Sequence, residues 1–453
     1  MKQIHELQDF FQTGKTLSKQ FRHEQLLKLK ASIKYHEQQL LDALKLDLNK
    51  PEQEAYSSEI AIVYEEINFA LKNLKSWMKK QKVKSPITLF YSKSYIYKVP
   101  RGIVLIIAPW NYPIQLVLSP LIGAIAAGNC VVIKPSEYTV NVNKVLQSII
   151  SYAFNPDYVI AIEGDGVEVI PRLINDFNFN YVFFTGSSQV GKEIAKLCAE
   201  KLIPYTLELG GKSPVIIDNK INLDVTCKRL IWSKFFNAGQ TCIAPDYVLI
   251  DYKIKDIFIK KLKATIKEFY PNNLNGFTKI INHKRFDILC NYIKDNQIIY
   301  GGKSDANNLM IEPTLVDEPS FNSEIMQKEI FGPILPIISF KSKAQLYEII
   351  DKNPNPLSLY IFSLDNKFCE EVIHKIPFGG GGINIGLFHL INPRLPFGGI
   401  MNSGNGCYHG KYSFEAFSHT KSIVNTATFL DIPIKYPPYS KWKIWLLKKL
   451  FVN

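Results

Sequence analysis

Short runs of apolar residues alternate with helical segments from about residue 100 onward, and this alternation constrains the fold more than any other feature. The first run, 103–108, contains no polar residue, as expected of a strand buried on both faces of a parallel sheet. Segments with helical spacing include 116–127 and 190–201. The alternation predicts an open α/β sheet. Further apolar runs lie at 131–133, 158–162, 181–184 and 215–217.

A second alternating region covers about 211–400 and predicts a second α/β unit. Before the first region, apolar residues of 1–82 recur at helical spacing, and we expect helices there. Residues 83–99 are rich in tyrosine and β-branched residues separated by polar ones, which predicts a hairpin. Residues 412–430 are again β-prone.

Composition indicates a globular chain without a nucleic-acid partner. The 453 residues are 46% hydrophobic and 21% charged, enough for a core in two or three domains. The formal charge is +13, but no dense block of lysine and arginine, zinc-finger pattern or aromatic RNA-binding motif occurs. We assign the charge to solvated helix faces.

The seven cysteines are odd in number and scattered, and no CxxC pair occurs. This argues against a disulfide framework or a structural zinc site, and we expect no bound metal and a reducing compartment. There is no secretory signal and no run of about 18 apolar residues. We therefore expect a cytoplasmic protein.

Two motifs suggest covalent catalysis. Cys242 lies in the uncharged loop FNAGQTCIAP, and Glu208 lies in LELGGK, an apolar stretch ended by a glycine pair. A thiolate is a good nucleophile, and a carboxylate with a pKa raised by apolar surroundings is a suitable base for activating water. Asn111, in PWNYP after a buried strand, could stabilise an oxyanion together with the backbone N–H of Cys242.

A dinucleotide site is indicated by the segment FTGSSQVGK, residues 184–192, which follows an apolar strand and opens a helix. A glycine-containing helix N-terminus suits a pyrophosphate. The spacing is G-x-x-x-x-G and departs from the ordinary G-x-G-x-x-G fingerprint, so the motif alone is weak. The segment KPSE, residues 134–137, also ends a strand.

Together with KEIFGP at 328–333, these motifs resemble the aldehyde dehydrogenase superfamily. Its members also have G-x-x-x-x-G spacing in place of the ordinary dinucleotide-binding fingerprint. The resemblance implies an aldehyde dehydrogenase-like α/β fold with a Rossmann-like NAD-binding domain, an α/β catalytic domain and a small β bridging element. Cys242 is then the nucleophile, Glu208 the base and Asn111 the oxyanion donor. The implied cofactor-binding residues are Lys134, Glu137, Thr185, Gly186, Ser187, Gly191, Glu329 and Phe331.

Motifs around the nucleophile and near the C-terminus, such as CIAPDY and LPFGG, are similar to the class 3, fatty-aldehyde branch. That branch oxidises medium- to long-chain and aromatic aldehydes, commonly as a homodimer with NAD or sometimes NADP. The carboxylate of Glu137 would repel a 2′-phosphate, which favours NAD. Residues 384–388 carry no second active-site cysteine. The resemblance implies a substrate pocket lined by Tyr112, Trp232 and Phe397.

The resemblance also sets the expected domains. Residues 1–82 and 100–209 form the cofactor domain, and 210–402 the catalytic domain. Residues 83–99 and 403–430 form the bridging element. The remaining tail, 431–453, is basic and amphipathic, with tryptophans opposite lysines. Two alternatives are open for it: peripheral contact with a membrane, or docking onto the protein or its partner subunit.

Two other functions compete with hydrolytic aldehyde oxidation. A non-catalytic structural or membrane-interaction protein could use the same fold, since fold alone does not specify function. The chain nevertheless carries a full set of chemistry-bearing residues, which such a protein does not need. Acyl transfer to a carrier thiol is the other alternative, and Glu208 argues for hydrolysis because water has to be activated.

Overall fold

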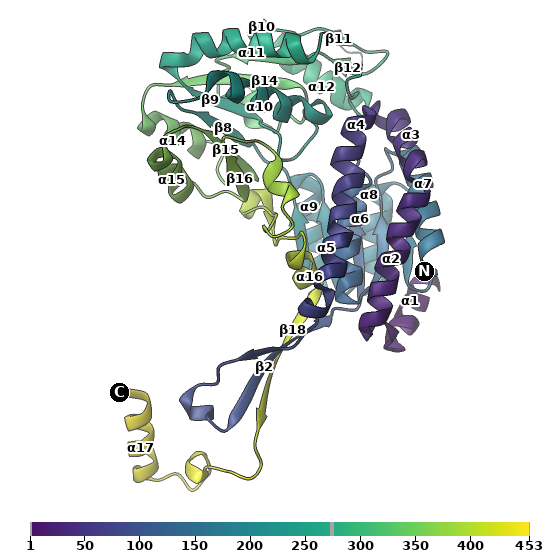
Figure 1. Cartoon of the computed structure of the whole chain (residues 1–453), viewed down its shortest axis with the longest axis vertical. Coiled ribbons are helices and arrows are strands. Elements are labelled where there is room, and N and C mark those ends of the chain that lie inside the picture. Colours follow the sequence, from purple (N-terminus) through teal and green to yellow (C-terminus); the bar gives the residue numbers. More distant parts are fainter. Residues whose placement is uncertain (1, 272–275, 453) are drawn as a thin grey trace. The chain divides into compact units, whose positions relative to one another are not determined.

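The computed structural model describes residues 2–271 and 276–452, and the chain divides into two compact units. The larger unit contains Met1–Trp77 and Val99–His419, and the smaller contains Met78–Lys98 and Thr420–Asn453. Each is described by itself. The larger unit holds two sheets, one of six and one of seven strands, with helices packed around them (Figure 1).

The six-stranded sheet has the order β17-β7-β6-β3-β4-β5 and is parallel except for β17. Its inner strands are buried along their whole length, which explains why they appear in the sequence as unbroken apolar runs. The strands are β3 (Ile103–Ile107), β4 (Cys130–Lys134), β5 (Val159–Ala161), β6 (Tyr181–Thr185), β7 (Tyr205–Glu208) and β17 (Gly404–Asn405).

Helices surround this sheet. As predicted, residues 116–127 are helical and lie in α6 (Gln115–Ala127), and the predicted helix 190–201 corresponds to α9 (Ser188–Glu200). Residues 1–82 are mostly helical, but a π-helical turn, η2 (Tyr56–Ile60), interrupts them between α4 and α5. The other helices are α1 (Lys2–Gln12), α2 (Lys19–Tyr35), α3 (Glu37–Leu48), α4 (Glu52–Ala55), α5 (Ala61–Trp77), α7 (Val140–Ala153) and α8 (Gly166–Asp176).

The seven-stranded sheet has the order β10-β13-β14-β9-β8-β15-β16 and confirms the second alternating region. All its pairs are parallel except β10 with β13. The strands are β8 (Pro214–Ile217), β9 (Tyr247–Asp251), β10 (Ile298–Tyr300), β13 (Thr314–Asp317), β14 (Ile334–Phe340), β15 (Ser358–Phe362) and β16 (Gly380–Ile383), and β11 (Ser304–Asp305) and β12 (Met310–Ile311) form a separate pair. The helices are α10 (Leu223–Phe235), α11 (Lys255–Phe269), α12 (His283–Lys294), α13 (Glu324–Gln327), α14 (Lys343–Asp351) and α15 (Asn366–Lys375).

A three-stranded sheet has the order β1-β2-β18, and most of its residues belong to the smaller unit. The predicted hairpin is confirmed, because β1 (Gln81–Val83) pairs antiparallel with β2 (Ser92–Pro100). It begins two residues earlier than expected, so the end of 1–82 is a strand and not a helix. The β-prone region is also shorter than expected: α16 (Lys411–Ala416) precedes β18 (Ser418–Thr426). Phe414 of α16 is buried against the Trp77 ring, and this long-range packing overrides local β propensity.

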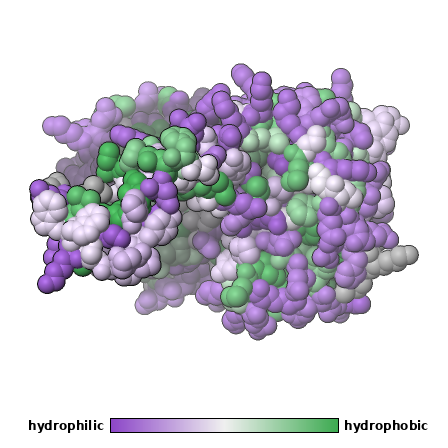
Figure 2. Space-filling view, turned by 90° about the horizontal axis from the view of Figure 1, so that it is seen from below, coloured by the Kyte–Doolittle hydropathy of each residue, from purple (hydrophilic) through white to green (hydrophobic). Residues whose placement is uncertain are grey.

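The last helix is α17 (Lys441–Val452), which covers about half of the basic tail 431–453. Within residues 2–271 and 276–452, no helix has the length and apolar character needed to cross a membrane. In the space-filling view of Figure 2, hydrophilic side chains are spread over the visible face and are not gathered in one block.

Candidate active site

The loop that carries Cys242 begins with an unusual backbone conformation. Asn237, Ala238 and Gly239 follow α10 with φ angles of 53°, 52° and 71°. This left-handed region is costly for alanine and is retained only where the surrounding structure imposes it. At Gly239 a Cβ atom would lie 2.4 Å from the carbonyl oxygen of Gly332, so the close approach requires glycine. The loop is therefore held in one conformation against the seven-stranded sheet.

Cys242 lines two adjoining cavities at the end of this loop. Burial raises the pKa of its thiol to about 12, with further contributions from Glu329 and Glu208. The backbone N–H groups of Cys242 and Ile243 act in the opposite direction by donating to the sulfur. The resting group is thus a neutral thiol, and its proton has to leave when the sulfur attacks.

Glu208 is the last residue of β7 and lines the same two cavities as Cys242. Its side chain is 2% exposed in relative terms, and neither carboxylate oxygen has a hydrogen-bond partner among the described residues. Burial raises its pKa well above the ordinary value. An unpartnered buried carboxyl that shares a cavity with a cysteine is available for proton transfer.

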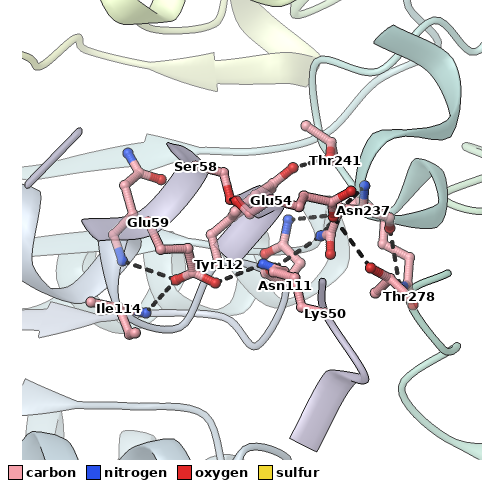
Figure 3. A network of polar contacts seen from close by, with 12 residues as sticks. Lys50, Glu54, Ser58, Glu59, Asn111, Tyr112, Ile114, Asn237, Thr241 and Thr278 are labelled. Atoms are coloured by element: carbon pink, nitrogen blue, oxygen red, sulfur yellow. Dashed lines mark hydrogen bonds and ion pairs between the residues drawn. The ribbon is translucent and has the colours of Figure 1, made fainter. Parts of the chain in front are cut away.

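Asn111 follows β3 and lines the second of these cavities with Cys242. Its side-chain Nδ2 donates to the carbonyl oxygen of Gln240 at 3.0 Å. Its own carbonyl oxygen accepts from Asn237 Nδ2 at 3.0 Å. Asn111 is therefore joined to the cysteine loop by hydrogen bonds in both directions (Figure 3).

A third cavity, of about 700 Å³, opens at the carboxyl ends of β3, β4 and β6. Parallel α/β sheets bind ligands at this edge. Lys134 ends β4 and is 1% exposed, and its Nζ donates to Pro135 O at 2.8 Å and lies 3.2 Å from Glu137 Oε2. Both residues line the cavity, so a paired charge faces its interior.

The predicted glycine-rich turn lies on the same cavity. Thr185, Gly186 and Ser187 all line it, and the Ser187 hydroxyl accepts from Val190 N as the N-cap of α9. The Thr185 hydroxyl is buried without a partner among the described residues. Gly191 lines none of the three cavities. A Cβ atom there would lie 2.6 Å from Leu209 Cδ2, so the packing of α9 requires its small size.

The second cavity, of about 250 Å³, connects the other two through shared lining residues. Glu329 and Phe331 line it with Cys242 and Glu208. The pKa of Glu329 is raised to about 8, mainly by burial and further by the nearby charge of Asp246. The Gly211 N–H, Arg285 and Lys212 act in the opposite direction and limit this rise.

Residue 210 has to be a glycine for Glu329 to lie here, because a Cβ atom on Gly210 would lie 2.1 Å from Glu329 Oε2. The Phe331 ring packs edge-on against the Trp110 ring, with 5.5 Å between centroids. Arg285 also lines this cavity and donates to Glu329 O at 3.2 Å. Nothing in the sequence around Arg285 pointed to the site.

The first cavity, of about 180 Å³, shares Cys242 and Glu208 with the second and has mainly apolar walls. The predicted pocket residues Tyr112, Trp232 and Phe397 all line it. The Tyr112 hydroxyl contacts the Thr241 hydroxyl at 2.5 Å, which links the pocket to the residue before Cys242. Sequence reasoning missed several apolar lining residues and two serines of η2. These are Ser57, Ser58, Ile62, Leu116, Phe236, Leu357, Leu387, Phe388, Leu390, Ile391 and Tyr408.

Residues 2–423 match the model of the aldehyde dehydrogenase family. The chain is 48% identical over 449 residues to 4,4'-diaponeurosporen-aldehyde dehydrogenase of Staphylococcus aureus, covering 98% of this chain and 97% of the relative. It is 40% identical to the "Aldehyde dehydrogenase, dimeric NADP-preferring" of Canis lupus familiaris, covering 94% and 95%.

Among solved structures, the fold matches the substrate-bound state of Staphylococcus aureus AldH with a TM-score of 0.96 and 47% identity, covering 99% of each chain. The α/β fold predicted from the sequence is thereby confirmed. The family model and these near-full-length similarities show that the chain belongs to the aldehyde dehydrogenase family.

Proposed function

We propose that this protein oxidises aldehydes to carboxylic acids with NAD or NADP, and that Cys242 and Glu208 carry the chemistry. One observation supports this most directly. Cys242 and Glu208 are common to an apolar cavity and to a more polar one, and the polar one leads to the large cavity at the strand ends. A substrate and a hydride acceptor could thus reach the same sulfur from opposite sides.

In the first step the Cys242 sulfur bonds to the aldehyde carbon and the thiol proton passes to a neighbouring base. The carbonyl oxygen becomes an oxyanion, for which the Asn111 side-chain amide and the Cys242 backbone N–H are the donors. Glu329 has a pKa of about 8 and lines the same cavity as Cys242. Its ionised form, whose population grows as the pH rises toward 8, can therefore accept the thiol proton.

The residues of the large cavity fit a nicotinamide dinucleotide. NAD and NADP are the cofactors found in solved relatives of this fold. Lys134 and Glu137 would hold the adenosine ribose, and the turn at Thr185, with its unpartnered buried hydroxyl, would receive the pyrophosphate. Glu329 and Phe331 would hold the nicotinamide end. When bound, the nicotinamide accepts the hydride that the thiohemiacetal carbon loses.

Loss of that hydride leaves a thioester on Cys242. Glu208 then takes a proton from water, the hydroxyl oxygen bonds to the acyl carbon, and the carbon–sulfur bond breaks to release the carboxylic acid. A carboxyl without hydrogen-bond partners and with a raised pKa is suited to this role, because its ionised form is a stronger base than a solvated carboxylate.

We propose medium- to long-chain or other apolar aldehydes as the substrate class. The apolar walls around Trp232 and Phe397 support this, and the relative from Staphylococcus aureus is named for the aldehyde of 4,4'-diaponeurosporene. NADH or NADPH formation at 340 nm should be measured with aldehydes from acetaldehyde to hexadecanal and with benzaldehyde. A specificity constant that rises with chain length is expected, and activity only on short polar aldehydes would contradict the substrate class.

Cys242→Ala should abolish this turnover, and Cys290→Ala is the matched control, because Cys290 is a partly buried cysteine of α12 that lines none of the three cavities. Substantial steady-state oxidation by Cys242→Ala would overturn the mechanism. Release of free acid without added carrier thiol distinguishes hydrolysis from acyl transfer. A wild-type protein inactive with every aldehyde and both cofactors would favour a structural role.

The expected domain boundaries, the homodimer and the cytoplasmic location remain proposals. All seven cysteines are free thiols, which supports a reducing compartment. In α17, Lys443 Nζ donates to Tyr436 O and Pro438 O at 2.8 and 2.9 Å, so this lysine is turned toward the preceding segment. The same Nζ lies 5.9 Å from the centroid of the Trp442 ring. Truncation near Tyr436 separates the tail's two alternatives, because it should abolish either liposome binding or dimer formation.

A further inference from the structure

A buried ion pair lies next to Asn111 but outside the three cavities. Lys50 follows α3, Glu59 lies in the π-helical turn η2, and Lys50 Nζ is 2.6 Å from Glu59 Oε1 with both side chains fully buried. We propose that Lys50 and Glu59 are positioning residues that hold the backbone on both sides of Asn111 and so direct its amide toward the oxygen of the substrate. This inference rests on the proposed aldehyde oxidation.

Lys50 holds the first side of this segment. Its Nζ donates to the carbonyl oxygen of Asn111 at 3.2 Å. The same ammonium group lies 4.4 Å from the ring centroid of Tyr112, a cation–π distance. Because a buried charge makes strong hydrogen bonds, Lys50 restricts the orientation of the peptide group between Asn111 and Tyr112.

Glu59 holds the second side. Its Oε2 accepts from the backbone N–H of Ile114 at 2.8 Å and of Gln115 at 3.3 Å. These amides open α6, where a carboxylate is favoured by the helix dipole. The π-helical turn widens the backbone at Glu59, and such turns recur at functional sites. The chain from Asn111 to Gln115 is thus bound at both ends by one ion pair.

The network continues into the cysteine loop (Figure 3). Asn237 Nδ2 donates to the Asn111 carbonyl at 3.0 Å and to Gln240 O at 3.1 Å. Glu54 Oε1 accepts from the Asn237 backbone N–H at 2.9 Å and from the Thr278 hydroxyl at 3.2 Å. The carbonyl of Asn111 is therefore shared by Lys50 and by the loop of the nucleophile, which connects the ion pair to both halves of the oxyanion site.

The arrangement differs from what stability alone would select. A buried ion pair contributes little to stability compared with apolar residues of the same volume. Here its hydrogen bonds go to the backbone around Asn111. The Asn111 amide has two N–H donors and gives one to Gln240 O at 3.0 Å. The direction of the second depends on the orientation of the residue, which the ion pair controls.

A double-mutant cycle tests this role. Asn111→Ala should lower kcat/KM for the aldehyde by about 10²–10³-fold, as loss of an oxyanion donor does. Lys50→Met should lower kcat/KM by about tenfold or more through misplacement of the amide, with the KM for NAD unchanged. Because Lys50 acts through Asn111, adding Lys50→Met to Asn111→Ala should have little further effect. Multiplicative losses would overturn the proposal.

Arg22→Met is the matched control. Arg22 is buried and donates to Ala126 O at 3.0 Å, so it holds the far end of the same helix α6. We expect it to lower the unfolding midpoint like Lys50→Met but to leave kcat/KM within about twofold. A single cooperative transition in urea, followed by tryptophan fluorescence, verifies that each variant is folded.

The double variant Lys50→Met/Glu59→Gln removes both charges and keeps the side-chain volumes nearly unchanged. Restored stability with kcat/KM still reduced is expected, since the bond to the Asn111 carbonyl is gone. Restoration of both to wild-type values would show a merely structural pair. An inactive wild-type protein would instead reject the proposed function itself.

Discussion

Two buried carboxylates, Glu59 and Glu208, differ in their partners and not in their burial. Glu59 is fully buried, is paired with Lys50 at 2.6 Å and accepts two backbone N–H groups. Glu208 is 2% exposed, and both its oxygens are without hydrogen-bond partners among the described residues. A carboxylate with a full set of partners fixes the groups around it, whereas one without partners is available to exchange a proton.

The difference also shows where the folded state loses stability in order to keep a reactive group. Leaving a buried polar group unpaired costs about 1–3 kcal/mol, and more for a charged group. Glu208 lines the two cavities that meet at Cys242, so water or substrate can supply the missing partner during turnover. Glu59 lines none of the three cavities, and only the protein can satisfy it.

The largest expected difference between the two carboxylates is in how their substitution affects turnover. Glu208→Gln should reduce steady-state kcat by about 10²–10⁴-fold, because the amide cannot take a proton from water. Since hydride transfer precedes this step, a burst of NADH close to one equivalent per active site should remain. Stopped-flow absorbance at 340 nm measures both. Glu193→Gln, at the edge of the large cavity, is the control and should show neither change. A lost burst would place Glu208 in acylation.

The same substitution should affect folding in opposite directions at the two sites. Glu59→Gln leaves Lys50 buried without a countercharge and should lower the free energy of unfolding by about 3–5 kcal/mol. Glu208→Gln removes an unpaired carboxyl and should leave stability equal to or above that of the wild type. Urea denaturation at pH 7, followed by tryptophan fluorescence, measures both. Equal losses for the two variants would break the comparison.

Sequence reasoning predicted Glu208 as the reactive carboxylate but gave no sign of Glu59 as a positioning one. Glu208 stands in an apolar strand next to a glycine pair, so local sequence already marks it as unusual. Lys50 and Glu59 stand in a helical region where charged residues are ordinarily solvated, and nothing local distinguishes them. Their role depends on contacts with Asn111 and Ile114, more than 50 residues away along the chain.

The fold, like the site, could be predicted where the signal lies in the local sequence and not where it depends on distant contacts. Buried parallel strands appear in the sequence as apolar runs, so both sheets could be predicted. The helix α16 could not, because Phe414 is ordered by packing on Trp77 from a distant helix. The pKa of Cys242 was likewise beyond local reasoning, since burial and two distant glutamates set it.

A smaller effect, on the pH dependence of stability, tests Glu329, which is intermediate between the two cases. Its pKa is raised from 4.5 to about 8, first by burial and then by Asp246. Between these values the folded state binds the proton more tightly than the unfolded state. The contribution of Glu329 is therefore present below about pH 4.5 and is lost as pH rises to 8.

Glu329→Gln removes this dependence. Its free energy of unfolding should rise relative to the wild type between pH 5 and 8, by at most about 1.4 kcal/mol per pH unit. Urea denaturation of both proteins at pH 5.5, 6.5 and 7.5 measures the difference. A constant difference would show that Glu329 is already ionised in the folded protein.

The smallest effect concerns Glu137, a partly exposed carboxylate with one partner, Lys134 Nζ at 3.2 Å. It lines the large cavity, so a 2′-phosphate bound near it would meet a like charge. At 4 Å and a surface dielectric this repulsion is on the order of a few kcal/mol, and salt and solvent reduce it. Glu137→Gln should therefore raise the ratio of kcat/KM with NADP to that with NAD by about tenfold. Glu193 lines the same cavity, and Glu193→Gln should change the ratio by less than about twofold, because its carboxylate is exposed and paired with Lys196 Nζ at 2.9 Å. An equal change in both variants would assign the preference to the overall charge of the cavity and not to a contact at Glu137.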